Sequence, residues 1–314
     1  MKYTEEVIKT ILDLHYDGVA SRQIAKLLEI SKSGVNYVVQ RNTELQYDPK
    51  EVAFKDGPRV LIFDTETAAA TALTFGRFKV NLSQDNILDN GGWLLCACWR
   101  WLGEKEVHRI WLSPNEVAEK NDSRLVARLF ELYEEADAVI AHNSQGFDHK
   151  VVQTRAVANG FPPLPQVKVL DTLLLVKKYL KLPSNRLDAI GEFFNLGRKI
   201  STGGISLWRR VQEGDLKAME DMVTYCAQDV DLLYEVYLRT RQLGRAGSDF
   251  NAALYYNDDK VRCRVCGSAD VEYTGRTTET SLNKFEEIRC KSCGAVHRDR
   301  KTITTKEKRK ALLA

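Results

Sequence analysis

The sequence VLIFDTE, residues 60–66, decides the fold of this chain. An unbroken apolar run that ends in an acid is typical of a strand covered on both faces. Side chains alternate between the two faces of a strand, so Asp64 and Glu66 share one face. Buried carboxylates are costly and repel one another unless cations lie between them. The stretch therefore predicts a central strand that contributes two acids to a divalent-metal site.

Three more polar residues interrupt apolar segments further along the chain. Asp148 ends the sequence HNSQGFD, and Tyr225 and Asp229 belong to YCAQD. Tyr225 and Asp229 are four residues apart in a segment with helical apolar spacing, so they lie on one face of a helix. We expect these residues to complete the site that Asp64 and Glu66 begin.

Residues 59–243 contain enough alternating apolar segments for the largest core of the chain. The pattern predicts strands at 59–66, 92–101, 106–112, 138–142 and 167–171. It predicts helices at 124–136, 148–159, 172–181, 186–195 and 215–243. Three successive strands, expected to form an antiparallel meander, precede alternating helices and strands. This order predicts an α/β fold with a mixed sheet and helices on its faces.

The block from Ile62 to Tyr234 resembles the DnaQ-like 3′→5′ exonucleases of the DEDD superfamily, which have an RNase H-like fold. FDTET, HNSQGFD and YCAQD occur in the family's order and on the expected elements. With its tyrosine, the last motif resembles that of the branch that includes polymerase proofreading domains and stand-alone phage exonucleases. A single D-x-E motif is weak evidence, but three motifs in order are specific.

The resemblance implies a role for each motif residue. Asp64 would bridge two cations, and Glu66 would hold one and accept a hydrogen bond from the terminal 3′-hydroxyl. Asp148 would support the second metal, often through water, and Asp229 would complete the cage. Tyr225 would orient the attacking water. Oxygen ligands suit two Mg²⁺ or Mn²⁺ ions, which would promote in-line displacement and release of nucleoside 5′-monophosphates.

Residues 1–44 are predicted to form a helix-turn-helix DNA-binding domain. Ser21 is expected to cap its second helix and Ser31 its third. In the DNA-binding domains that this segment resembles, the last helix enters the major groove of duplex DNA. A helical protein-interaction module is the alternative. The residues expected on the DNA-facing surface are Lys32, Ser33, Asn36, Tyr37 and Gln40.

Residues 261–300 are predicted to form a zinc ribbon. Cys263-x2-Cys266 and Cys290-x2-Cys293 are spaced for four thiolate ligands to one structural Zn²⁺. A module of this size has too little core to fold without a metal or another crosslink. The ribbon would bind DNA or a replication or repair protein. The other cysteines, in apolar segments, are expected to be small core residues: Cys96, Cys98 and Cys226.

The rest of the chain is predicted to be linkers, at 45–58 and 246–260, and a basic tail at 301–314. From Arg239 onward there are 17 lysines and arginines against 10 acids, although the net charge of the whole chain is only +3. This excess favours a contact with phosphates over a purely solubilising role. Apolar runs of 18 or more residues and a secretion signal are absent, so we expect no membrane partner and a cytoplasmic protein of a bacterial or phage-infected cell.

Two other classes of protein combine related features. Transposases and integrases join a helix-turn-helix to an RNase H-like core, but their third acid is typically a helical glutamate rather than Tyr-x3-Asp. A non-catalytic DNA-binding regulator would usually have lost an acid. RNA is an alternative substrate, because such a site recognises 3′-hydroxyl ends and phosphates. Asp171 is expected to cap a helix. Three aromatic residues would pack in the core or stack on terminal bases: Phe75, Phe78 and Trp93.

Overall fold

The computed structural model describes residues 3–16, 19–42, 57–76, 78–196, 203–244 and 249–312. Chain contacts divide the protein into one unit, Met1–Lys50, and a second, Glu51–Ala314. The predicted linker 45–58 lies outside the described residues up to residue 56. Within the described ranges, no helix combines the length and the apolar composition that crossing a membrane requires.

The described residues of the first unit form three helices around a small core. These are α1 (Glu5–Tyr16), α2 (Ser21–Leu27) and α3 (Lys32–Asn42). The core contains one residue of α1, Ile11, and two from each of the other helices: Ile24, Ala25, Val35 and Val38. This pattern agrees with the predicted helical spacing of the apolar residues.

The two serine caps predicted in this unit differ in outcome. Ser31 caps α3, because its hydroxyl accepts a hydrogen bond from the backbone N–H of Gly34 at 3.0 Å. Ser21 does not cap α2. The N-cap residue is Ala20, which has no side-chain cap, and Ser21 is the first residue of the helix.

The second unit is built around a five-stranded mixed sheet with the order β5-β4-β1-β6-β7. The strands are β1 (Val60–Thr67), β4 (Leu94–Trp101), β5 (His108–Trp111), β6 (Ala138–Ala141) and β7 (Lys168–Asp171). β1, β4 and β5 pair antiparallel, which confirms the predicted meander. β6 runs parallel to β1, and β7 runs parallel to β6. β1 lies at the centre, as its apolar run requires.

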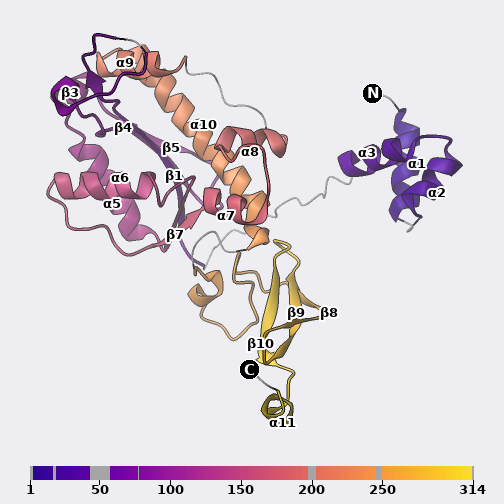
Figure 1. Cartoon of the computed structure of the whole chain (residues 1–314). Helices are drawn as coiled ribbons and strands as arrows, with labels where there is room; N and C mark the ends of the chain where they lie inside the picture. The colour runs from indigo at the N-terminus through magenta and orange to yellow at the C-terminus, as the bar shows by residue number, and fades with distance from the viewer. Residues whose placement is uncertain are drawn as a thin grey trace. The chain divides into compact units, whose positions relative to one another are not determined.

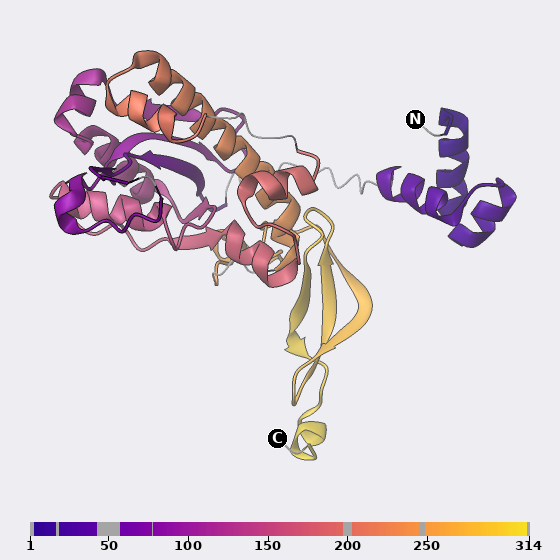
Figure 2. The ribbon, with the colours of Figure 1, turned by 45° about the horizontal axis from the view of Figure 1, so that its top comes forward.

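Helices cover both faces of this sheet. They are α4 (Pro114–Glu119), α5 (Ser123–Glu135), α6 (Asp148–Ala158), α7 (Thr172–Tyr179), α8 (Leu187–Phe193), α9 (Ile205–Gln212) and α10 (Leu216–Thr240). α10 packs against β1 and β4 and also contacts α7, α8 and α9. Figures 1 and 2 show the sheet between α10 and the α5–α6 pair. The sheet and helices therefore form the α/β layers that the sequence predicts.

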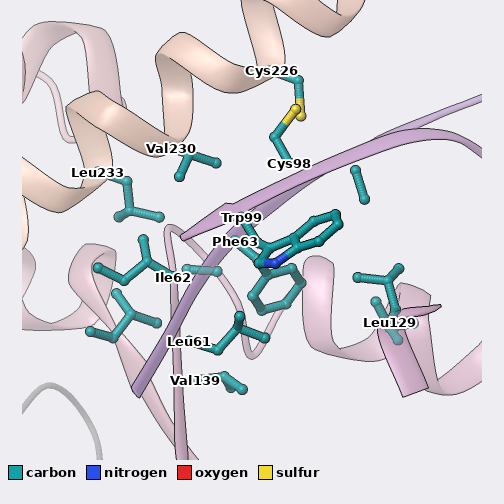
Figure 3. Close-up of a cluster of buried hydrophobic side chains, with 14 of the residues drawn as sticks. Leu61, Ile62, Phe63, Cys98, Trp99, Leu129, Val139, Cys226, Val230 and Leu233 are labelled. Carbon is teal, nitrogen blue, oxygen red and sulfur yellow. The ribbon is translucent and has the colours of Figure 1, made fainter. Parts of the chain in front are cut away.

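The core side chains alternate across β1. Figure 3 shows Ile62 facing Val230 and Leu233 of α10, whereas Phe63 lies toward Leu129 of α5. Leu61, Ile62 and Phe63 are all completely buried. The even-numbered residues of β1 therefore face α10, and this parity directs Asp64 and Glu66 to the same helix.

Several short elements were not predicted. They include β2 (Thr71–Ala72), β3 (Ile87–Asp89) and the 3₁₀ helix η1 (Gln84–Asn86) between β1 and β4, together with α4 and α9. A 3₁₀ turn, η2 (Arg241–Leu243), ends α10. The described part of the predicted linker 246–260 is folded rather than open. It contains η3 (Ala252–Tyr255), whose completely buried Ala252 belongs to the main core.

The C-terminal part contains a second, three-stranded antiparallel sheet with the order β10-β9-β8. Its strands are β8 (Val271–Glu279), β9 (Lys284–Cys290) and β10 (Val296–Thr302). The predicted basic tail is partly regular, because α11 spans Lys306–Lys310.

Candidate active site

Three of the predicted acids converge where β1 meets α10. Asp64, Glu66 and Asp229 each offer a carboxylate oxygen, and these oxygens all lie within 4.8 Å of one another. Asp229 is only 4% exposed, whereas Asp64 and Glu66 are half-buried. Asp64 and Glu66, which strand alternation directs to one face, and Asp229 of α10 thus form one cluster, which we call the acid group.

Cysteine side chains lie next to the acid group. Across the β1–β4 ladder Asp64 pairs with Cys98 and Glu66 pairs with Cys96. Figure 3 shows the side chains of Cys98 and Cys226 pointing toward one another between β4 and α10. The Cys226 thiol donates to the backbone carbonyl of Asp64 at 3.5 Å. Burial raises the pKa of Cys226 well above its ordinary value, so this thiol stays neutral beside the acids.

Asp148, predicted to support a second metal through water, lies close to β1. It is 2% exposed at the start of α6, but it does not belong to the group of three mutually close carboxylates among the described residues. One of its oxygens accepts a hydrogen bond from the Thr65 hydroxyl at 3.0 Å. Thr65 lies between the two acids of β1, so its side chain points to the opposite face of the strand. Asp148 is therefore next to the acid group through β1 but outside it.

The environment of Asp148 favours its protonated form. Burial raises the pKa of Asp148 to about 6, and the nearby Asp171 carboxylate adds to this rise. The hydrogen bond from Thr65 opposes it. A buried acid held in this way becomes a good anionic ligand only when a compensating positive charge is close.

Asp171 shapes the loop that leads to Asp148. Its side chain caps α7 by accepting from the backbone N–H groups of Leu173 at 2.9 Å and Leu174 at 3.3 Å. It also accepts from the backbone of Asn143 and Gln145, in the loop before α6. The capping role predicted for Asp171 is confirmed, and the same carboxylate fixes the path of the HNSQGFD segment.

His142 is held by two protein partners. Its Nδ1 lies 2.9 Å from the Thr172 hydroxyl, and its Nε2 lies 2.9 Å from the carbonyl oxygen of Asn185. Because a carbonyl only accepts, Nε2 carries the proton and Nδ1 accepts from Thr172 in the neutral ring. The ring therefore joins the end of β6 to the segment before α8.

Tyr225 lies on α10, one turn before Asp229, and its side chain is half-buried. The helical repeat places the two residues on neighbouring positions of one face. Asp64, Glu66, Tyr225 and Asp229 therefore come from two elements that pack directly on each other.

Two residues with contacts beside the acid-bearing end of β1 were not predicted from the sequence. Thr65 lies between the two acids in the sequence, and strand alternation directs its side chain to the other face of β1. Gln212 of α9 pairs with the backbone of Ala69, just after β1. Its Oε1 accepts from the Ala69 N–H at 3.0 Å, and its Nε2 donates to the Ala69 carbonyl at 3.1 Å. A contact between residues so far apart in sequence leaves no local pattern.

The acid group has the donor set of a hard divalent cation. Three carboxylates within 4.8 Å supply oxygen ligands and negative charge, which Mg²⁺ and Mn²⁺ prefer. Like charges this close are unfavourable unless a cation or protons neutralise them. Asp64, Glu66 and Asp229 therefore fit a metal of this class.

A second cluster contains the four cysteines of the C-terminal part. The sulfur atoms of Cys263, Cys266, Cys290 and Cys293 lie within 4.8 Å of one another, and all four side chains are completely buried. The Cys263–Cys293 and Cys266–Cys290 sulfur distances are 3.5 and 3.6 Å. A tetrahedral zinc site with Zn–S bonds of about 2.3 Å requires a sulfur spacing of about 3.8 Å.

The turns that carry the cysteines are built alike. The backbone N–H groups of Gly267 and Gly294 donate to the carbonyl oxygens of Cys263 and Cys290 at 2.8 and 2.9 Å, respectively. Gly267 and Gly294 both adopt φ 70°, a backbone conformation that glycine tolerates best. The His297 Nε2 lies 3.1 Å from the Cys263 sulfur. Four convergent sulfurs held by two such turns fit a metal that prefers thiolates.

The residues predicted to face DNA lie on α3. Lys32, Ser33 and Asn36 are exposed. The side chains of Tyr37 and Gln40 lie outside the described part of the structure.

Comparison with known protein families finds a match to part of the chain. Residues 89–240 match the profile of the RNase H superfamily. This range contains Asp148, Tyr225 and Asp229, whereas Asp64 and Glu66 precede it. No curated protein sequence matches the chain.

Solved structures also resemble the chain. One is the family B DNA polymerase from the hyperthermophilic archaeon Pyrobaculum calidifontis, with 15% sequence identity and a TM-score of 0.41. The alignment covers 72% of this chain and 32% of the polymerase, so the chain spans about a third of that protein's length. On the evidence of the profile match and the mixed five-stranded sheet, the chain contains an RNase H-like superfamily domain.

Proposed function

We propose that this protein is a metal-dependent 3′→5′ exonuclease that hydrolyses phosphodiester bonds at the 3′ ends of DNA. The observation that carries the proposal is the acid group. Carboxylates from β1 and α10 converge within 4.8 Å in a chain whose residues 89–240 match the RNase H superfamily. The order of the three motifs, with tyrosine in the last, supports the exonuclease class over other nucleases. The products would be nucleoside 5′-monophosphates.

Each residue of the proposed site has a task that its position supports. Asp64, Glu66 and Asp229 would hold Mg²⁺ or Mn²⁺, which would supply charge neutralisation and a more acidic water. Glu66 would also accept a hydrogen bond from the terminal 3′-hydroxyl. Tyr225 would orient the attacking water from one turn along α10. Asp148 would contribute through water and through its bond to Thr65, since it lies outside the acid group.

The flanking parts are proposed to hold the nucleic acid. The segment α2–turn–α3 would bind duplex DNA as a helix-turn-helix, with Lys32, Ser33 and Asn36 exposed for this contact. Tyr37 and Gln40 are proposed to extend the same surface. The four-cysteine cluster would hold one structural Zn²⁺ in a ribbon that contacts DNA or a replication or repair protein. The process served would be replication, repair or recombination.

The proposal is tested with a single-stranded DNA labelled at its 5′ end, in Mg²⁺ or Mn²⁺. The wild type is expected to produce a ladder that shortens from the 3′ end, and Asp64→Ala is expected to abolish it. Asp221→Asn is the matched control, because Asp221 is an exposed acid on α10 bonded to Lys217. It should digest like the wild type.

Matched RNA and duplex substrates separate the alternatives. Digestion of RNA alone would replace the proposal with an exoribonuclease. No metal-dependent digestion of any of the three would leave a non-catalytic or transposase-like DNA-binding protein.

A further inference from the structure

The segment that joins β1 to β4 exposes apolar side chains. Phe75 is fully exposed and Phe78 is 82% exposed. Trp93, which the sequence grouped with them, is only 5% exposed and belongs to the main core. The three aromatic residues therefore separate into one core residue and two residues of an exposed loop, whose described residues are 73–76 and 78–82. Large apolar side chains that are exposed close together in the sequence make this loop a candidate binding surface.

The base of this loop is held firmly. The backbone N–H of Leu73 donates to the Asn86 carbonyl at 2.9 Å, and the Asn86 side chain donates back to the Leu73 carbonyl at 3.1 Å. Closer to β1, Gln212 of α9 pairs with both backbone groups of Ala69. The loop is thus anchored at the end of the strand that carries Glu66.

The chemistry of the loop matches unpaired nucleotides. The described residues of this loop contain two phenylalanines and Lys79, and no acid. The Lys79 ammonium lies 5.5 Å from the centre of the Phe78 ring. Aromatic faces stack on bases of any sequence, and neighbouring cations follow the phosphates. Phe75 is nine residues beyond Glu66, so it lies within about 30 Å of that acid, a span of several nucleotides.

We propose that this loop is a stacking platform for the single-stranded DNA that enters the acid group. Phe75 and Phe78 stack on unpaired bases a few nucleotides upstream of the 3′ end, and Lys79 contacts their phosphates. Gln212 anchors the chain at Ala69, between β1 and the loop. The inference rests on the proposed exonuclease function and names the part of the chain that selects an unpaired strand.

Local fluorescence tests the platform without requiring hydrolysis. A set of oligothymidylates carries one 2-aminopurine, whose fluorescence changes when it stacks, at successive positions from the 3′ end. Binding to the full chain is followed in Ca²⁺. The wild type should alter the signal at one or two adjacent positions, and Phe75→Ala/Phe78→Ala should remove it. Affinity for the strand should fall about tenfold for each stacked base that is lost.

Two further variants separate stacking from folding. Phe75→Tyr/Phe78→Trp keeps the aromatic faces and should restore the signal. Leu88→Ala shortens a 61%-exposed aliphatic side chain on β3 of the same segment and should bind like the wild type. An unchanged signal in the double alanine variant would overturn the platform.

The outcomes distinguish this inference from the exonuclease proposal. If the wild type digests the strand but alters no 2-aminopurine position, the platform is refuted and the exonuclease stands. If the wild type digests nothing but alters the 2-aminopurine signal, and the double alanine variant does not alter it, the exonuclease is refuted and the loop remains a single-strand binding site.

Discussion

Replacing Asp229 with asparagine is expected to stabilise the metal-free protein and to remove its stabilisation by Mg²⁺. Asparagine keeps the shape of the side chain but cancels its charge. In the absence of metal, that charge lies close to those of Asp64 and Glu66. The same replacement removes a ligand from the proposed cation. One change should therefore have opposite effects on stability in the two conditions.

The size of the effect follows from the spacing of the acid group. Two unit charges 4.8 Å apart repel by about 3.5 kcal/mol at an effective dielectric constant of about 20, and by about 0.9 kcal/mol in water. Asp64 and Glu66 are half-buried, which favours the lower part of this range, so we expect a gain of about 1–3 kcal/mol. In a domain of this size, each kcal/mol raises the melting temperature by about 2–4 °C.

Mg²⁺ should reverse the order of stability. At about 100 times its dissociation constant, a cation that binds only the folded protein adds about 2.7 kcal/mol to the wild type. Asp229→Asn should gain much less, so the two melting temperatures should cross as Mg²⁺ is added. Differential scanning calorimetry in metal-depleted buffer measures this. A chelator is avoided, because it would also strip the proposed zinc.

The control for this experiment is again Asp221→Asn. Asp221 is an exposed acid on the same helix and should follow the wild type at every Mg²⁺ concentration. The reasoning is refuted if Asp229→Asn melts below the wild type without metal and both gain equally from Mg²⁺. The three carboxylates would then neither repel one another strongly nor share a cation.

Three further changes test other parts of the molecule. Cys290→Ser should reduce bound zinc from one equivalent per chain toward none, as measured by elemental analysis of the purified protein. Burial raises the pKa of Asp122, but the hydrogen bonds from Arg155 and other donors outweigh it and hold this pKa below its ordinary value. The contribution of Asp122 to stability is therefore present above the unfolded pKa of about 3.9 and is lost as the pH falls through the folded pKa. Asp122→Asn should cost about 3–5 kcal/mol in denaturant unfolding at pH 7 and flatten that acid limb. Ile11→Ala should destabilise the three-helix unit by about 2–5 kcal/mol, seen as an earlier calorimetric transition, whereas the exposed Leu27→Ala should change it little.

Much of the sheet was predictable because it depends on local periodicity. The apolar run before Asp64 specifies a strand buried on both faces, and strand alternation alone directs Asp64 and Glu66 to one side. The four-residue spacing of Tyr225 and Asp229 does the same on α10. These positions require no knowledge of tertiary structure, and the acid group follows once α10 packs on β1.

The position of Asp148 depends on tertiary structure and could not be derived in that way. Whether it joins the acid group or bonds to Thr65 is decided by how α6 docks on the sheet. The same holds for Gln212, which bonds to Ala69 although the two residues are 143 positions apart in the sequence. Ser21 was wrongly expected to cap α2, because a serine inside the first turn has the same composition signal as one at the cap.

One consequence of α10 links the two clusters. The helix is 25 residues long, and Tyr237 follows Asp229 by eight residues, or about 12 Å along the axis. Burial raises the pKa of Tyr237 to about 12, and the cysteines of the four-cysteine cluster, Cys293, Cys266 and Cys263, add to that rise. The helix that carries Asp229 therefore also extends to the surroundings of these sulfur atoms. Removal of the proposed zinc from the four cysteines would therefore change the surroundings of Tyr237, which lies on the same helix as Asp229.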